Sequence, residues 1–188
     1  PDGKKIAFTV NRGGHQLLGI FENTQTPIHW IAPSFHRYSQ PKWSSDGNKI
    51  AFIKTLGGEG GAFSLLEPRH VPWEIWIADV SSGEGKMLWK APETLRGSYR
   101  YPFFAFPNAN ELIFESYQDG WQHLYSLDIN SGTTTLLTPG DYMVEQIKLS
   151  PDNKKLVFSA NTGPEKEDMD RRHIGSVDLF SKKLNWET

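Results

Sequence analysis

The chain contains no cysteine, which excludes disulfide bonds, cysteine-bound metals and thiol chemistry. It also lacks any run of about 18 apolar residues, the length that a membrane-spanning helix requires. Neither sign of charge dominates, because 20 Lys and Arg residues stand against 22 Asp and Glu residues. The net charge of −2 creates no overall field that would attract nucleic acid or an anionic membrane. We therefore expect neither nucleic acid nor a membrane among the partners.

Helical periodicity is missing as well. No long segment repeats its apolar residues every 3.6 positions, and only GAFSLLEP at 61–68 could form a helical turn. Aromatic residues make up 13% of the chain and favour strands, while 17 Gly and 12 Pro supply turns. A chain of 188 residues can bury a sizeable core. These features predict an all-β domain over residues 1–188.

A short unit recurs along the chain. Each copy reads as a tight turn built on Asp-Gly or Asn, followed by an apolar strand, because these turn residues tolerate positive φ. The copies are PDGKKIAF at 1–8, SSDGNKIAF at 44–52, FPNANELIF at 106–114 and SPDNKKLVF at 150–158. An apolar segment precedes the turn in three copies, at 38–43, 101–106 and 145–149. We interpret the two segments as the first and second strands of a hairpin.

A third and a fourth strand follow each hairpin. The third-strand segments share an acidic residue at one position, and we expect it to form hydrogen bonds in the turn after the strand. These segments are 17–23, 74–80, 123–129 and 173–179, with Glu22, Asp79, Asp128 and Asp178 at the shared position. The fourth-strand segments are 27–33, 86–92, 134–140 and 183–188.

Four short antiparallel strands in each unit of about 44 residues are typical of a β-propeller blade. The alternative is a β-sandwich, but a sandwich does not require four aligned copies. The predicted blades are approximately 1–37, 38–96, 97–140 and 141–188. The first blade lacks its first strand, so we expect an arc of about four four-stranded blades from a larger propeller. Open blade edges of such an arc would favour self-association.

One segment carries a more specific resemblance. SYQDGWQHLYSLD at 116–128 resembles a blade of the N-terminal propeller of prolyl-oligopeptidase-family serine peptidases, in the dipeptidyl-peptidase and acylaminoacyl-peptidase branch. The stretch from Gly140 to Leu179 is similar to the following blade. The Asp-Gly repeat itself is found in many bacterial propellers, periplasmic ones included. A bacterial periplasm or cytoplasm is therefore the expected location.

The resemblance implies a role without catalysis. In that family the propeller sits over an α/β-hydrolase domain, its expected partner, and filters peptide substrates. No G-x-S-x-G nucleophile elbow is present, so we expect no catalytic residue and no catalytic domain in this chain. We also expect no cofactor or metal. No adjacent Glu-Glu pair exists, so dipeptidyl specificity does not carry over and peptide specificity stays open.

The arginines suggest a binding face. In a propeller, the connections between second and third strands, and between a fourth strand and the next blade, open on one face. Every arginine falls in or beside such a connection. The predicted substrate or domain-interface residues are Arg37, Arg96, Arg100, Arg171 and Arg172. Arginine suits such a face because its planar guanidinium group binds carboxylates and carbonyls in fixed geometry. The alternative is local pairing, for example of Arg171 and Arg172 with Glu165, Glu167, Asp168 and Asp170.

Two further functions remain open. One is a protein-binding propeller like that of the periplasmic Tol system. The other is a propeller lyase acting on oligogalacturonates, whose chemistry would need histidines that converge on a divalent metal. Metal analysis would separate the lyase from the other two, and a downstream hydrolase domain would decide for the peptidase.

Overall fold

The computed structural model describes residues 1–57, 66, 70–98, 102–165, 168 and 171–188. Apart from one short 3-10 helix, the regular structure in these residues is β-strand. The chain forms two compact units, Pro1–Arg100 (unit 1) and Tyr101–Thr188 (unit 2), and each is described by itself. The described residues contain no helix long and apolar enough to cross a membrane.

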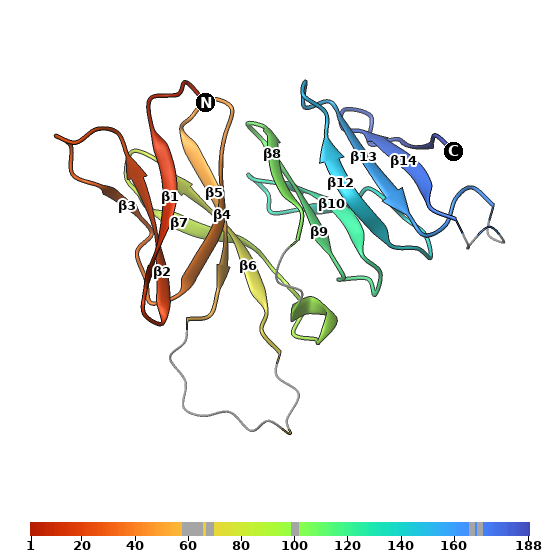
Figure 1. The fold of residues 1–188 in the computed structure, drawn as a ribbon, viewed down its shortest axis with the longest axis horizontal. Helices are drawn as coiled ribbons and strands as arrows, with labels where there is room; N and C mark the ends of the chain where they lie inside the picture. The colour runs from red at the N-terminus through yellow and green to blue at the C-terminus, as the bar shows by residue number, and fades with distance from the viewer. Residues whose placement is uncertain (58–65, 67–69, 99–101, 166–167, 169–170) are drawn as a thin grey trace. The chain divides into compact units, whose positions relative to one another are not determined.

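Unit 1 contains two antiparallel sheets in which consecutive strands are neighbours (Figure 1). Sheet 1 has three strands: β1 (Ile6–Arg12), β2 (His15–Phe21) and β3 (His29–Ile31). Sheet 2 has four: β4 (Arg37–Trp43), β5 (Lys49–Thr55), β6 (Trp73–Asp79) and β7 (Gly85–Lys90). The 3-10 helix η1 (Arg96–Ser98) follows β7.

The two sheets of unit 1 share one core. Leu18 and Ile31 of sheet 1 are fully buried and belong to the same cluster as Ile50 and Phe52 of sheet 2. A backbone hydrogen bond from Gln16 N of β2 to the carbonyl oxygen of His36 also joins sheet 1 to the connection that precedes β4. Alternation along each strand places these apolar residues on the face toward the other sheet.

Unit 2 repeats this arrangement with two four-stranded meanders. Sheet 3 consists of β8 (Phe104–Asn108), β9 (Glu111–Ser116), β10 (His123–Asp128) and β11 (Thr134–Leu136). Sheet 4 consists of β12 (Val144–Leu149), β13 (Lys155–Ala160), β14 (His173–Asp178) and β15 (Leu184–Trp186). Their shared core includes Ile113 and Leu124 from sheet 3 and Phe158 and Val177 from sheet 4.

The predicted all-β propeller class is confirmed, and the first sheet has three strands, as the missing first strand implied. Observed strand bounds differ from the predicted ones by a few residues. The first strand of sheet 3 begins at Phe104, whereas the prediction placed a strand over 101–106. The helical turn considered at 61–68 lies outside the described residues, apart from Leu66. The observed 3-10 helix at Arg96–Ser98 was not predicted, because three residues carry no periodic signal.

The aligned acidic residues cap turns at the ends of their strands. Asp79, Asp128 and Asp178 each accept hydrogen bonds from two backbone N–H groups and one serine hydroxyl in the following turn. These bonds hold the pKa of each carboxyl below its ordinary value. Glu22 differs, because the next residue, Asn23, accepts the turn hydrogen bonds instead.

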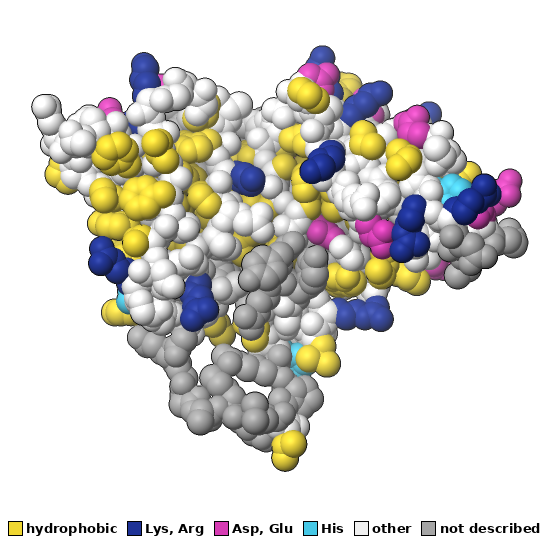
Figure 2. All heavy atoms as spheres, in the orientation of Figure 1, with side chains coloured by type: hydrophobic (Ala, Val, Ile, Leu, Met, Phe, Trp, Pro, Cys, Tyr) yellow, Lys and Arg dark blue, Asp and Glu magenta, His cyan; other side chains and the backbone are white. Residues whose placement is uncertain are grey.

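Surface side chains differ between the units on the face shown in Figure 2. Hydrophobic side chains gather over β1–β3, whereas basic and acidic side chains are interspersed over unit 2. Exposed apolar residues of sheet 1 and its connections include Ile6, Ile28 and Phe35, which are 61%, 40% and 67% exposed.

Candidate functional site

One end of each sheet carries the connections between second and third strands and those between fourth strands and the next first strand. We call this the loop end. At the loop end of sheet 2, three charged residues form a row across adjacent strands. Lys54 of β5 is the register partner of Glu74 of β6, and Glu74 is in turn the register partner of Lys90 of β7. Directly paired residues project from the same face of a sheet, so this row concentrates alternating charge.

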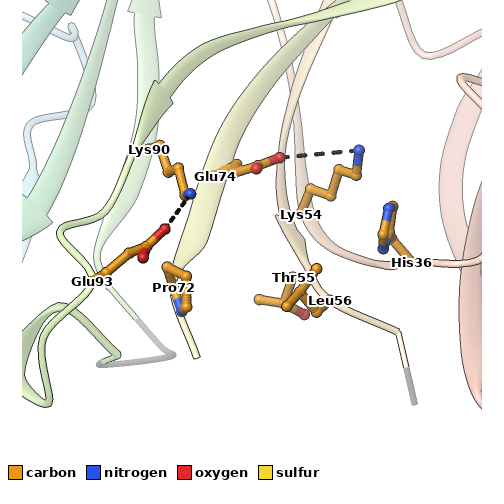
Figure 3. A pocket seen from close by; sticks show the side chains of 8 residues that line it. All are labelled: His36, Lys54, Thr55, Leu56, Pro72, Glu74, Lys90 and Glu93. Carbon is orange, nitrogen blue, oxygen red and sulfur yellow. Dashed lines mark hydrogen bonds and ion pairs between the residues drawn. The ribbon is translucent and has the colours of Figure 1, made fainter. Parts of the chain in front are cut away.

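A pocket opens beside this row, with a volume of about 150 Å³ (Figure 3). We call it the ionic pocket. It is lined by His36, Lys54, Thr55, Leu56, Pro72, Glu74, Lys90 and Glu93. Because a water molecule occupies about 30 Å³ of liquid, the pocket has room for one side chain or one chain terminus.

Lys54 is the most enclosed cation of the pocket. Its side chain is 13% exposed, and its Nζ lies 3.8 Å from the centre of the Trp76 ring and 4.0 Å from Glu74 Oε2. Trp76 Nε1 donates a 2.6 Å hydrogen bond to the same oxygen. Burial lowers the pKa of Lys54, an effect opposed by the carboxylate of Glu74. The ring and the carboxylate therefore hold the ammonium in place.

Lys90 and Glu93 form the other ion pair of the pocket, with Nζ and Oε1 2.6 Å apart. Their hydrogen bond raises the pKa of Lys90 and lowers that of Glu93, so both remain charged near neutral pH. Both side chains are more than 40% exposed. An arriving ammonium or carboxylate group could therefore exchange with one partner of the pair.

The two described arginines that were predicted in unit 1, Arg37 and Arg96, do not line the ionic pocket. No arginine is among the described residues that line it. Arg37 is exposed, and its Nε donates a 3.2 Å hydrogen bond to the carbonyl oxygen of Gly14. Arg96 is exposed and begins η1. Arg100 lies outside the described residues. His36, next to Arg37, does line the pocket.

The arginines of unit 2 pair with local acids. Arg171 Nε donates to Asp168 Oδ1 at 3.1 Å, and this pairing lowers the pKa of Asp168. Arg172 binds Glu145 through two hydrogen bonds, of 2.8 and 3.4 Å, a partner that the sequence did not indicate. Glu167 and Asp170 lie outside the described residues. The five arginines are thus divided between the two units, and their role at a binding face stays a prediction.

The charged row of Lys54, Glu74 and Lys90 was not predicted from the sequence. A signal was available, because Lys54 directly follows the buried run IAFI and Glu74 begins the next apolar segment. Antiparallel pairing places the end of one strand opposite the start of the next. The prediction placed these two strands side by side in one blade, but it did not pair their individual residues.

The fold and the repeated sheets define a β-propeller protein. Residues 75–185 match a family model described as the dipeptidyl peptidase IV (DPP IV) N-terminal region. This match covers more than half of the chain, so the chain belongs to that family, the N-terminal propellers of S9 peptidases. This match confirms the resemblance of the DGWQHLY segment to an S9 peptidase propeller.

One curated protein is similar in sequence and one solved structure is similar in fold. The uncharacterized peptidase YuxL of Bacillus subtilis is 28% identical over 92% of this chain, and the match covers 30% of YuxL. A puromycin-hydrolyzing peptidase of Mycobacterium tuberculosis has a similar structure, with a TM-score of 0.66, 15% identity and coverage of 100% of this chain and 28% of that one. The chain therefore spans less than a third of the length of these peptidases.

The fold also occurs outside peptidases. An oligogalacturonate lyase solved in complex with manganese gives the same TM-score of 0.66 at 12% identity, and the match covers 97% of this chain and 50% of that one. Fold similarity therefore does not separate these functions.

Proposed function

We propose that this chain is the substrate-binding and substrate-gating propeller of a serine peptidase that cleaves oligopeptides, and that it is itself non-catalytic. The observation that carries the proposal is the family match over residues 75–185, together with the similarity to a peptidase along 92% of the chain. The catalytic α/β-hydrolase domain would belong to the same polypeptide. The proposal is compatible with a peptidase that releases dipeptides from peptides and with one that releases acylated amino acids.

The ionic pocket supports peptide binding at the loop end of unit 1. Peptides carry ammonium groups, carboxylates and polar amides. Glu74 and Glu93 can accept hydrogen bonds from an ammonium group, and Lys54 and Lys90 can donate to a carboxylate. The volume of about 150 Å³ suits one such group. Exposed arginines near this end, Arg37 and Arg96, would add donors for peptide carbonyls or for the hydrolase domain.

Steady-state kinetics of the full-length protein test the proposal. We expect hydrolysis of short peptides, and we expect Lys90→Met and the pair Arg96→Ala with Arg100→Ala to raise KM by roughly three- to tenfold with kcat nearly unchanged. Such a pattern indicates lost substrate binding without damage to the catalytic centre. Lys86→Met is the matched control, because Lys86 is an exposed lysine near the opposite end of the same strand, β7.

Two results would contradict the proposal. One is a full-length protein that hydrolyses no peptide but cleaves oligogalacturonates in a metal-dependent reaction. The other is peptide hydrolysis whose KM responds equally to Lys86→Met and to the loop-end variants, because a general effect on folding would then account for the change.

A further inference from the structure

A second pocket lies at the loop end of unit 2, and three of its nine lining residues are aromatic. We call it the aromatic pocket. Its volume is about 540 Å³, within the range of roughly 300–1,000 Å³ that is typical of ligand sites. The lining residues are Trp121, Gly140, Asp141, Tyr142, Asn161, Thr162, Gly163, Pro164 and Trp186. They come from three connections and from the last strand, and none of them belongs to the ionic pocket.

Two of the aromatic residues that line this pocket, Tyr142 and Trp186, are packed against other rings. Tyr142 is 4% exposed and makes edge-to-face contacts with Trp186 and His123, with ring centres 5.3 and 5.4 Å apart. Trp186 makes a similar contact with Phe158 at 6.1 Å. Trp121, at 37% exposed, leaves part of its ring free to contact a ligand.

The connections around the pocket are tied to one another. Met143 N donates to Asn161 Oδ1 at 2.8 Å, and Val144 N donates to the carbonyl oxygen of Gln122 at 2.8 Å. Gly140 has φ of 143°, and a Cβ there would lie 2.5 Å from the ring of Tyr142. These contacts form the pocket without a ligand, which reduces the ordering cost of binding.

The charge of the pocket favours a cation. Asp141 is the one charged residue among the described residues that line it, and it is exposed. The described arginines of the adjacent connection, Arg171 and Arg172, are paired with Asp168 and Glu145. Faces of Trp and Tyr attract cations through their ring quadrupoles, and a nearby carboxylate adds direct attraction.

We infer that the aromatic pocket binds a basic side chain of a peptide, Lys or Arg, with the cation against the aromatic rings and near Asp141. The inference rests on the proposed function, because it assigns a preference to the peptide substrate. The volume of about 540 Å³ also accommodates residues that flank the basic one.

The test uses the full-length protein and two labelled hexapeptides that differ at one position, Arg in one and its neutral isostere citrulline in the other. Binding is measured by fluorescence anisotropy at times shorter than turnover, and hydrolysis by kcat/KM. We expect the Arg peptide to bind about five- to twentyfold more tightly. Asp141→Asn and Trp121→Ala should each reduce this ratio to below about twofold, and Trp121→Phe should retain part of it.

Phe180→Ala and Glu84→Gln serve as controls. Phe180 is a 98% exposed aromatic residue in the turn between β14 and β15, away from the loop end, and Glu84 is an exposed carboxylate in unit 1. Both should keep the wild-type ratio.

The outcomes separate the two proposals. Peptide hydrolysis with equal binding of the two peptides, or with a ratio unchanged in Asp141→Asn and Trp121→Ala, overturns the aromatic-pocket inference alone. Arg-selective binding that depends on Asp141 and Trp121 without any hydrolysis supports the pocket and overturns the peptidase proposal. If neither peptide binds and Trp121→Ala lowers the melting temperature, another part of the protein fills the pocket and the inference fails.

Discussion

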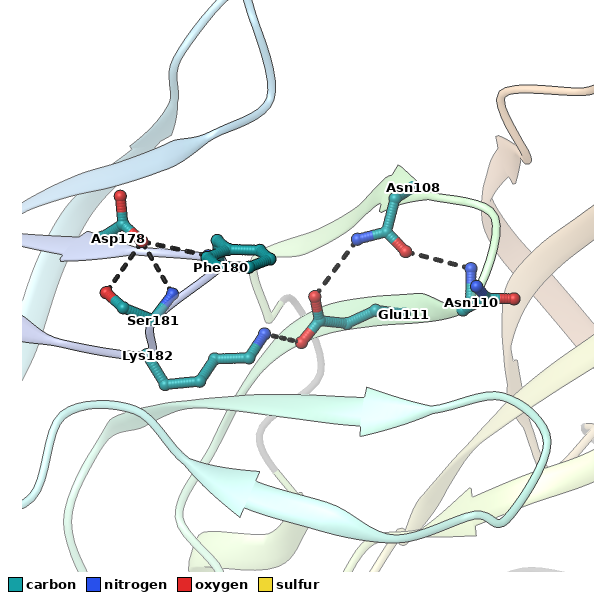
Figure 4. Close-up of polar contacts among 7 residues, drawn as sticks. All are labelled: Asn108, Asn110, Glu111, Asp178, Phe180, Ser181 and Lys182. Atoms are coloured by element: carbon teal, nitrogen blue, oxygen red, sulfur yellow. Dashed lines mark hydrogen bonds and ion pairs between the residues drawn. The ribbon is translucent and has the colours of Figure 1, made fainter.

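One turn residue that is not glycine has a positive φ at a position where the equivalent turns have glycine. In the turn after the third strand, Gly83 and Gly132 have φ of 75° and 74°, while Lys182 occupies the same position with φ of 59°. A left-handed conformation strains a residue that has a Cβ. Lys182 also forms an ion pair with Glu111 at the start of β9, and Asn108 donates to the same carboxylate (Figure 4). The residue thus combines an unfavourable backbone with a favourable contact between sheets 3 and 4.

Substitutions of Lys182 should separate these two effects. Lys182→Ala keeps the strain and removes the ion pair, whereas Lys182→Gly removes both. We therefore expect the free energy of unfolding to be about 1 kcal/mol higher for Lys182→Gly than for Lys182→Ala. Urea denaturation measures this difference, and Lys183→Ala in the same turn is the control. Equal stabilities of the Gly and Ala variants would mean that the turn is unstrained.

At the scale of the strand, a side chain can continue the hydrogen bonding of a sheet beyond the point where backbone pairing ends. β11 is only three residues long, but beyond its end Thr138, which is fully buried, accepts a 2.9 Å hydrogen bond from Leu124 N through Oγ1. β-Bulges interrupt the regular pairing of β4 and β12, the first strands of sheets 2 and 4. The register shifts between Ser39 and Lys42 and between Glu145 and Lys148, around Gln40 and Gln146, which have φ of 52° and 51°. Local pairing in the sheets thus depends on single residues that strand periodicity does not identify.

Thr138→Val should measure the contribution of this side-chain extension. Valine has the same shape but cannot accept a hydrogen bond, so Leu124 N would stay buried without its partner. We expect the free energy of unfolding to fall by about 1–3 kcal/mol. Thr135→Val, an exposed position in β11, should change it by less than about 0.5 kcal/mol. A similar effect of both substitutions in urea denaturation would show that the hydroxyl of Thr138 has no special role.

At the scale of the whole molecule, the stability of the fold should depend on pH through one buried carboxyl group. Glu115 is 4% exposed, and its Oε2 accepts a 2.9 Å hydrogen bond from Phe103 N. Burial raises its pKa from 4.5 to about 7, because the charged form is poorly solvated. Between these two pH values the folded state keeps a proton that the unfolded state has released. Raising the pH through this window therefore destabilises the fold.

We expect the free energy of unfolding to fall by up to roughly 3 kcal/mol between about pH 5 and about pH 8. Glu115→Gln, which carries no charge at any pH, should abolish this dependence. Asp79, Asp128 and Asp178 have lowered pKa values, so their contribution is lost only as the pH falls through and below about 4. Urea denaturation of the wild type and of Glu115→Gln across the pH range checks this prediction, and a wild-type profile that is flat above pH 5 would contradict the assignment.

Self-association through open blade edges remains a prediction at this scale. The exposed apolar side chains Ile6 and Ile28 of sheet 1 and its connections are the surface that such contacts would cover.

The sequence alone was sufficient for the fold class, the strand order and the turns. These features depend on local physics: alternation along a strand sets its buried face, and Asp, Asn or Gly sets the turn that follows. The serine hydrogen bonds of Asp79, Asp128 and Asp178 follow from the same local chemistry. The family could also be recognised, because DGWQHLY and the segment after it form contiguous pieces of the chain.

Only the tertiary structure defined the two pockets. An insertion separates Lys54 from Glu74 and a turn separates Glu74 from Lys90, and the three residues become neighbours through strand register. Trp121, Tyr142 and Trp186 meet because two sheets pack and their connections converge at one end. Side chains distant in sequence acquire a common environment only when the strands between them are paired and packed, and no local pattern records which residues will then face one another.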